Sequence, residues 1–226
     1  MDILHLDDAI LVLGKPAGLP VLPDGWEQDA PYLVKMLEAD YGKIWVVHRL
    51  DKITSGVMVF ARTAEAHQEL NRQFEHHEVC KVYHAIVEGN PKWDEHTARH
   101  PLRVNVGHKH RTVVDSRNGR PAATHFRVLE RFAGACLLEA IPETGRTHQI
   151  RAHAAALGHP LLADSVYGSR ATEGPARPAL HAMSLTFVHP LDKQSLSFQC
   201  QYPHDFTNTL QKLRGRQSLE NDLTLL

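Results

Sequence analysis

The feature that most constrains the fold is a series of short apolar runs, each bounded by turn residues. The run at residues 9–13 reads AILVL and stops at GKPAG, and such boundaries are typical of buried strands. Similar runs predict strands at residues 57–61, 82–87, 123–131, 135–141, 184–188 and 195–201. Strands outnumber helices and do not alternate with them strictly. The pattern therefore predicts an α+β fold with a mixed, mostly antiparallel sheet and helices packed on it.

Three segments predict helices. Residues 30–41 carry an apolar stripe at helical spacing. Thr63 is suited to cap a second helix that continues to about His77, with apolar residues four positions apart. Thr144 is a candidate cap for a third helix, which starts near Arg146 and ends at Gly158, a residue suited to the left-handed position that follows a helix.

Length and composition indicate an ordinary soluble protein. Of the 226 residues, 42% are hydrophobic and 23% charged, and we expect them to form a single domain over residues 1–226. No stretch approaches the roughly 18 apolar residues of a membrane helix, and the acidic start MDILHLDDAI does not resemble a secretory signal. Cys80, Cys136 and Cys200 are far apart and match no CxxC motif, so we expect reduced thiols and a cytoplasmic protein.

The charge distribution is uneven although the net charge is only −1. One segment between residues 103 and 120 carries five basic residues against one acid, Asp115. Such a basic loop can bind phosphate with modest electrostatic steering. A merely solvated hairpin is the alternative. The basic residues are Arg103, Lys109, Arg111, Arg117 and Arg120.

The stretch HRLDKITSG at residues 48–56 places charged residues between two apolar runs. An isolated aspartate in such a loop more often caps a turn, and Arg49 could simply form a salt bridge. The alternative is that Asp51 lies at the end of the sheet and takes part in chemistry. The closing glycine permits a positive φ or a close approach of another backbone.

Two further segments carry candidate residues. Arg146 and Arg151 lie in ETGRTHQIRAH, where five-residue spacing on one helix would point them in different directions. They are either two solvated arginines or partners of different groups. Tyr83 lies in a strand face that is otherwise apolar, where a tyrosine is more commonly a core aromatic whose hydroxyl bonds to the backbone.

The seventeen histidines do not predict a metal site. HHEVC at residues 76–80 and HKH at 108–110 have no second pair at zinc-site spacing, and HExxH, HxxEH and CxxC are absent from the sequence. The GxSxG elbow of hydrolases and the Walker A loop are also absent.

Together, these segments resemble the RluA-type pseudouridine synthases. HRLDKITSG is similar to the family signature HRLDxxTSG, and KPAGL at 15–19 is similar to the turn that opens the catalytic domain. KVYHAIVEG at 81–89 resembles the KxYxAxVxG strand, and ETGRTHQIR at 143–151 the TGRxHQIR helix. LGHP, DSVYG and LHA follow in the family's order, ending near residue 190. Gly14 and Ala163 depart from the family's usual Asn and Gly, outside the catalytic set.

The resemblance implies an isomerase that converts uridine in RNA to pseudouridine without metal or organic cofactor. It implies that Asp51 is the catalytic aspartate, that Tyr83 stacks on the target uracil and assists proton transfer, and that Arg151 pairs with Asp51. Arg49 would fill the space left by the flipped uridine. The implied RNA-binding residues are Arg49, Arg103, Lys109, Arg111, Arg117, Arg120 and Arg146.

The implied architecture is the pseudouridine synthase catalytic fold, with a catalytic cleft across the sheet and no separate N-terminal RNA-binding domain. The expected partner is a stem-loop of rRNA or tRNA, and the expected state is a monomer that does not bind membranes. A catalytically silent RNA-binding or chaperone module of the same fold is the alternative function. A metal-dependent hydrolase that uses Asp51 is a third hypothesis, for which the sequence offers no ligand set.

Overall fold

The computed structural model describes residues 1–23, 30–107, 111–171 and 174–224. The chain forms two compact units. The first contains residues 1–81 and 181–201, and the second contains residues 82–180 and 202–226. The prediction of one catalytic domain over residues 1–226 stays a prediction.

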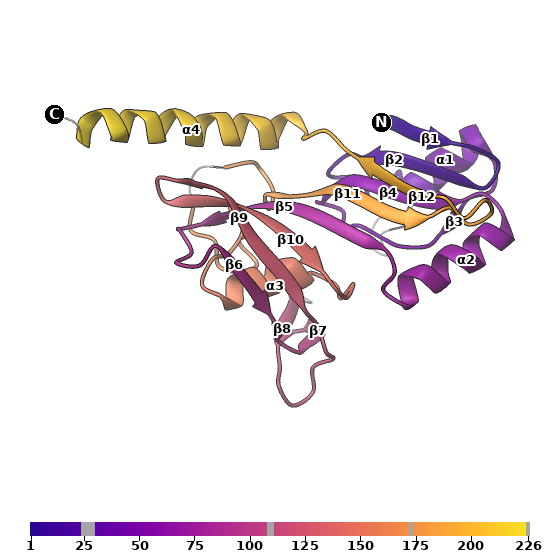
Figure 1. The fold of residues 1–226 in the computed structure, drawn as a ribbon, viewed down its shortest axis with the longest axis horizontal. Helices are drawn as coiled ribbons and strands as arrows, with labels where there is room; N and C mark the ends of the chain where they lie inside the picture. The colour runs from indigo at the N-terminus through magenta and orange to yellow at the C-terminus, as the bar shows by residue number, and fades with distance from the viewer. Residues whose placement is uncertain (24–29, 108–110, 172–173, 225–226) are drawn as a thin grey trace. The chain divides into compact units, whose positions relative to one another are not determined.

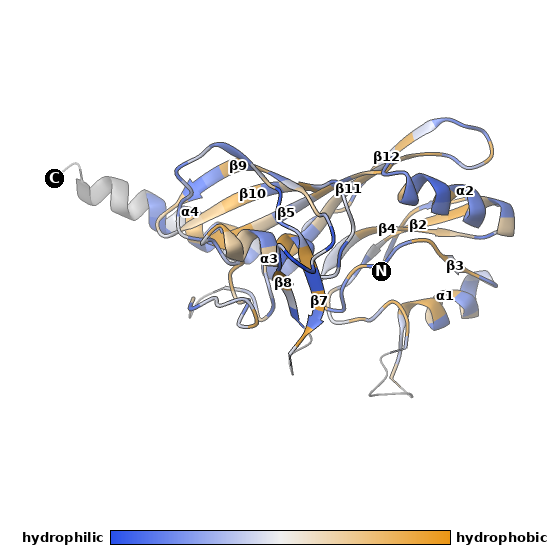
Figure 2. Ribbon diagram, turned by 90° about the horizontal axis from the view of Figure 1, so that it is seen from below, coloured by the Kyte–Doolittle hydropathy of each residue, from blue (hydrophilic) through white to orange (hydrophobic). Residues whose placement is uncertain are grey.

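The first unit is built on a sheet in which β2 (Ile10–Lys15) and β4 (Ser55–Ala61) are the central strands. Every residue of both strands is buried, and Figure 2 shows both as largely hydrophobic ribbons. β1 (Asp2–Leu6) pairs with β2, and β2 with β4, antiparallel in both cases, whereas β11 (Leu180–Val188) pairs with β4 in parallel. β3 (Trp45–Val46) pairs with β4, and β12 (Ser195–Gln199) pairs with β11, both antiparallel.

Among the described residues, the helices of this first unit are α1 and α2. α1 (Leu33–Tyr41) buries Leu33, Val34 and Leu37, and α2 (Ala64–Glu75) buries Ala66 and Leu70. The predicted cap of α2 is confirmed, because the Thr63 side chain accepts a hydrogen bond from the amide of Ala66 at 3.1 Å.

The second unit contains an antiparallel sheet in the order β5 (Cys80–Glu88), β10 (Ala135–Pro142), β9 (Thr124–Phe132) and β6 (Glu95–Ala98). The two faces of β5 separate as the alternation predicts: Ala85 and Val87 pack in one apolar cluster, and Ile86 packs in another. α3 (Gln149–Ala156) contributes Ile150 and Ala154 to the first cluster.

α4 (His204–Thr224) contributes Phe206, Leu210 and Leu213 to the second cluster. The two helices therefore cover opposite faces of this sheet, as Figure 1 shows. The α+β class with a mixed, mostly antiparallel sheet is confirmed.

Several boundaries differ from the predictions. α1 begins three residues later than expected, because Pro31 disfavours a helical backbone at Ala30 and Tyr32 has the extended backbone of a residue that precedes a helix. The third helix begins at Gln149 rather than near Arg146, since His148 takes a left-handed conformation with φ 53°. Thr144 is therefore not its cap, whereas Gly158 has the predicted positive φ of 85°.

The basic segment after residue 102 is a β-hairpin rather than an open loop. β7 (Leu102–Val106) pairs with β8 (Arg111–Val114) in a separate two-stranded sheet. The sequence patterns also did not predict β1, β6 or α4. No helix in the described part of the chain is long and apolar enough to cross a membrane.

Candidate active site

The HRLDKITSG segment links β3 to β4 in the first unit, and its backbone closes a turn around Asp51. The amide of Thr54 donates to the carbonyl of Asp51 at 3.0 Å, and the Lys52 carbonyl accepts from the amide of Gly18 at 2.8 Å. The KPAGL turn after β2 is therefore bonded directly to the segment that carries Asp51. Asp51 itself is half-buried, and the neighbouring Arg49 is exposed.

Lys15 strengthens this connection from inside the unit. It ends β2 with only 2% of its surface exposed. Its ammonium donates to the carbonyls of Pro16 at 2.8 Å, Leu19 at 2.9 Å and Lys52 at 3.2 Å. A lysine has three such donors, so these contacts give the buried charge a full set of acceptors. Lys15 therefore positions the peptide that follows Asp51, a role that its place in KPAGL did not reveal.

His48 holds the beginning of the segment against β4. Its Nε2 accepts a hydrogen bond from the amide of Val59 at 3.1 Å, and its ring stacks on Phe74 with centroids 4.6 Å apart. Burial, followed by the positive charge of Lys81, lowers the pKa of His48 to about 3. His48 is therefore neutral near pH 7, and its basic nitrogen is occupied by the backbone.

The end of the segment is held by a buried histidine on β11. His181 Nε2 lies 3.0 Å from the Cys200 carbonyl, which can only accept, so Nε2 carries the proton. In the neutral imidazole, Nδ1 then accepts from the Ser55 hydroxyl, 2.9 Å away. Gly56 has φ 125°, and a Cβ there would lie 2.2 Å from the Ala182 carbonyl oxygen. These contacts explain why TSG and LHA belong together in this fold.

The second unit places Arg151 in a buried ion pair that the sequence did not suggest. Its Nε lies 2.7 Å from Asp164 Oδ2, and a terminal nitrogen lies 2.8 Å from Oδ1. Asp164 is fully buried and Arg151 is 3% exposed. The Arg151 guanidinium also lies over the ring of Tyr167, 4.9 Å from its centroid. Asp51 belongs to the first unit, and its pairing with Arg151 stays a prediction.

Tyr83 and Arg146 complete the predicted candidates in this unit. Tyr83 is half-buried on β5 opposite Ala140, and it packs against the cluster that contains Ala85 and Val87. Arg146 precedes α3 rather than lying on it, so the expected helical spacing to Arg151 is wrong. Its backbone amide donates to Gln149 Oε1 at 3.1 Å, and its buried Nε has no hydrogen-bond partner among the described residues.

The comparisons with known proteins identify the family. A family model described as RNA pseudouridylate synthase matches residues 9–156. The chain belongs to the RNA pseudouridylate synthase family. It is therefore an isomerase that converts uridine in RNA to pseudouridine, and RNA is its partner.

Relatives within this family match nearly the whole chain. Ribosomal large subunit pseudouridine synthase D of Zymomonas mobilis is 36% identical over 91% of this chain and 70% of its own. An uncharacterised RNA pseudouridine synthase of Mycobacterium bovis is 40% identical over 95% of this chain and 73% of its own. The solved structure of human RNA pseudouridylate synthase domain containing 4 covers 94% of this chain and 92% of its own, with a TM-score of 0.76 and 27% identity.

The arginines between residues 103 and 120, which were expected to bind RNA, differ in their surroundings. Arg103 pairs with Asp115 at 2.8 Å, and Asp115 also accepts from the amides of Arg117 and Asn118. These backbone hydrogen bonds lower the pKa of Asp115. Arg111, Arg117 and Arg120 are exposed, and Lys109 lies outside the described residues.

Neither a metal site nor a salt bridge at Arg49 is found among the described residues. Within the described ranges, no group of three or more His, Cys, Asp or Glu side chains could hold a metal ion. Arg49 makes no ion pair with any described residue. The salt-bridge interpretation of Arg49 therefore has no support from the described residues.

Proposed function

We propose that the protein isomerises a specific uridine in a stem-loop of rRNA or tRNA, with Asp51 as the catalytic aspartate. The observation that carries this proposal is the geometry of the HRLDKITSG turn. Lys15 and Gly18 bond to its backbone and the His48 side chain anchors its start, while Asp51 is half-buried and Arg49 is exposed. A substrate can reach these side chains without displacing the backbone that positions them.

The reaction needs no co-reactant. The bond between uracil N1 and ribose C1′ breaks, the uracil turns, and a new bond forms between C5 and C1′. C5 loses its proton and N1 gains one, so atoms and electrons balance. An ionised carboxylate beside the sugar can initiate this cleavage as a nucleophile or base, and an arginine within about 4–6 Å favours its ionised form.

The other candidate residues take the roles that this chemistry requires. Tyr83 stacks on the detached uracil and assists proton transfer, which suits an aromatic side chain already held against the sheet. Arg151 pairs with Asp51, and Arg49 occupies the space from which the uridine is extruded. A guanidinium plane can replace lost base stacking.

RNA outside the target nucleotide is held by basic side chains of the second unit. The sequence between residues 103 and 120 carries Arg103, Lys109, Arg111, Arg117 and Arg120, and Arg146 precedes α3. Phosphate contacts of this type provide affinity and orientation rather than sequence discrimination. We infer that the two units act as one catalytic domain, as a monomer in the cytoplasm, where the three free cysteines remain reduced.

Total RNA from cells that lack the gene is the substrate for the direct experiment. The wild-type protein is expected to produce pseudouridine at one or a few positions, located by sequencing after chemical labelling. Asp51→Ala and Asp51→Asn should produce none, whereas Asp40→Asn, an exposed change on α1, should match the wild type. RNA binding without any pseudouridine would instead favour a catalytically silent binding module.

A further inference from the structure

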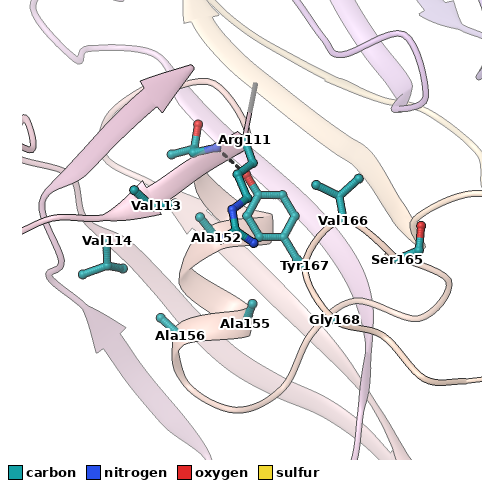
Figure 3. A pocket seen from close by; sticks show the side chains of 11 residues that line it. Arg111, Val113, Val114, Ala152, Ala155, Ala156, Ser165, Val166, Tyr167 and Gly168 are labelled. Carbon is teal, nitrogen blue, oxygen red and sulfur yellow. Dashed lines mark hydrogen bonds between the residues drawn. The ribbon is translucent and has the colours of Figure 1, made fainter. Parts of the chain in front are cut away.

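The second unit contains a hollow of about 510 Å³ that the proposed catalytic roles do not use. It lies between β8, α3 and the loop 165–168, as Figure 3 shows. Neither Asp51 nor Tyr83 is among its lining residues. Its size lies within the range of small-molecule sites and exceeds what one flat nucleobase needs.

One wall of the hollow is made by small and apolar side chains. Ala152, Ala155 and Ala156 face it from α3, and Val113 and Val114 face it from β8. Alanines leave room beside the helix, and apolar surfaces suit the flat faces of a base. Such a wall offers no hydrogen bond that would select one base over another.

Tyr167 also lines the hollow, and its ring is held from two sides. Its hydroxyl accepts from the amide of Thr112 at 2.9 Å, drawn as a dashed line in Figure 3. Arg151 covers one face of the ring and does not itself line the hollow, so the ring meets the hollow with its other face or its edge. Because Asp164 holds Arg151, this aromatic wall is rigid before any ligand arrives.

Charge decides which ligand suits the hollow. Its eleven lining residues include one cation, Arg111, and no acidic residue. Arg111 is exposed, and its side chain extends from β8 toward the Tyr167 ring in Figure 3. Arg117 and Arg120 are also exposed in the turn that follows the same hairpin. An aromatic wall beside an arginine is the combination that binds single-stranded nucleic acid through base stacking and phosphate contact.

We propose that this hollow is a subsite for an unpaired nucleotide of the substrate RNA, other than the uridine that is isomerised. Its base lies between Tyr167 and the alanines of α3, and its phosphate meets Arg111. This inference rests on the proposed function for the identity of the RNA. It adds a second point at which the protein binds an unpaired nucleotide.

The test fills the hollow and measures RNA binding directly. The probes are ribosomal RNA and transfer RNA transcribed with 4-thiouridine, which crosslinks to adjacent side chains under ultraviolet light. In the wild type, a crosslinked nucleotide is expected on the peptide that contains Tyr167. Ala156→Trp, which adds a ring at an exposed end of α3, should remove that crosslink and weaken binding about tenfold, within the contribution of one stacked base. Ala176→Trp, an exposed change outside the lining, should do neither.

A second variant tests the charge. Arg111→Gln should weaken binding by about threefold to tenfold and make the salt dependence less steep by about one phosphate contact. Lys212→Gln, the same change of charge on α4, should leave both unchanged. No crosslink at Tyr167 in the wild type, or binding by Ala156→Trp as tight as the wild type, would overturn the subsite.

Binding and catalysis are scored separately, so the two proposals fail in different ways. If Ala156→Trp binds like the wild type while pseudouridine still forms, the subsite is wrong and the proposed function stands. If the crosslink appears and is lost on filling but no pseudouridine forms on any RNA, the proposed function is wrong and the subsite stands.

Discussion

The turn around Asp51 and the region around Arg151 hold their charged residues in opposite ways. In the first unit, the backbone is bonded on both sides by Lys15, Gly18 and Thr54, while the Asp51 side chain is half-buried and Arg49 is exposed. In the second unit, the side chains themselves are fixed, because Arg151 and Asp164 form a bidentate pair with almost no exposed surface.

The two ways of holding charged residues serve different purposes, namely presenting a side chain to a substrate and fixing a side chain inside the unit. A turn that is held through its backbone can present a reactive side chain to a substrate without moving. A buried charged pair gives up accessibility in exchange for a fixed position, and here it supports the ring of Tyr167. Substitutions in the Arg151–Asp164 pair should therefore mainly reduce the stability of the fold. Substitutions of Asp51 or Arg49 should mainly reduce pseudouridine formation or RNA binding.

The largest expected loss of stability follows from breaking the buried pair. Asp164→Ala leaves the Arg151 guanidinium buried without its carboxylate and should reduce the free energy of unfolding by about 3–5 kcal/mol. Denaturant titration measures this loss. Replacing both residues, as in Arg151→Met with Asp164→Leu, should recover part of it, and a double variant less stable than Asp164→Ala would contradict the account.

A smaller loss is expected where an ammonium holds the backbone. Lys15→Met removes a donor from three carbonyls and should cost about 2 kcal/mol, since the removal of a buried charge offsets part of the lost hydrogen bonding. Pseudouridine formation should fall as well, because Lys15 positions the peptide after Asp51. Lys35→Met, an exposed change on α1, serves as the control. Full activity in Lys15→Met would show that the turn does not need this support.

The pH dependence of stability tests His48. Its folded pKa of about 3 lies below its ordinary value of 6.5, so the unfolded chain binds a proton between these values that the folded chain does not. Stability from this residue is present above pH 6.5 and is lost as pH falls toward 3, by up to about 1.4 kcal/mol per pH unit. His48→Gln should flatten the curve of melting temperature against pH in this window. An unchanged slope would mean that His48 is not held neutral.

The smallest structural effect is expected at Arg49. Because it is exposed and makes no ion pair among the described residues, Arg49→Gln should change the free energy of unfolding by less than about 0.5 kcal/mol. Its effect should appear as weaker RNA binding and a higher KM for a stem-loop substrate. A large loss of stability with unchanged kinetics would place Arg49 among the structural residues instead.

The elements that could be predicted from the sequence are those with a clear local pattern, such as a continuous apolar run or a helix cap. β2 and β4 are continuous apolar runs, and Thr63 caps α2 through a local contact, so both could be read from neighbouring residues. α4 was missed because polar residues predominate in its sequence, and the apolar residues that it contributes to the core among the described side chains, Phe206, Leu210 and Leu213, are few. The start of α3 was misplaced because His148 takes a left-handed conformation that its residue type does not require.

The candidate site was predictable in its motifs and not in its contacts. Asp51 and Arg49 were recognisable from HRLDKITSG, since the signature lies within nine consecutive residues. Ser55 and His181 are 126 positions apart, and the pairing of Arg151 with Asp164 depends on how a loop returns to α3. Only the folded chain brings such residues together, so no local pattern could identify them as partners.

The central claim is that Asp51 acts on RNA from a turn whose backbone is held by Lys15, Gly18 and Thr54. The direct measurement compares pseudouridine formation and melting temperature in the wild type, Asp51→Asn and Asp164→Asn. The account predicts that Asp51→Asn forms no pseudouridine and melts at a higher temperature than Asp164→Asn, which weakens the buried ion pair with Arg151. Pseudouridine formed by Asp51→Asn at the wild-type rate would contradict it.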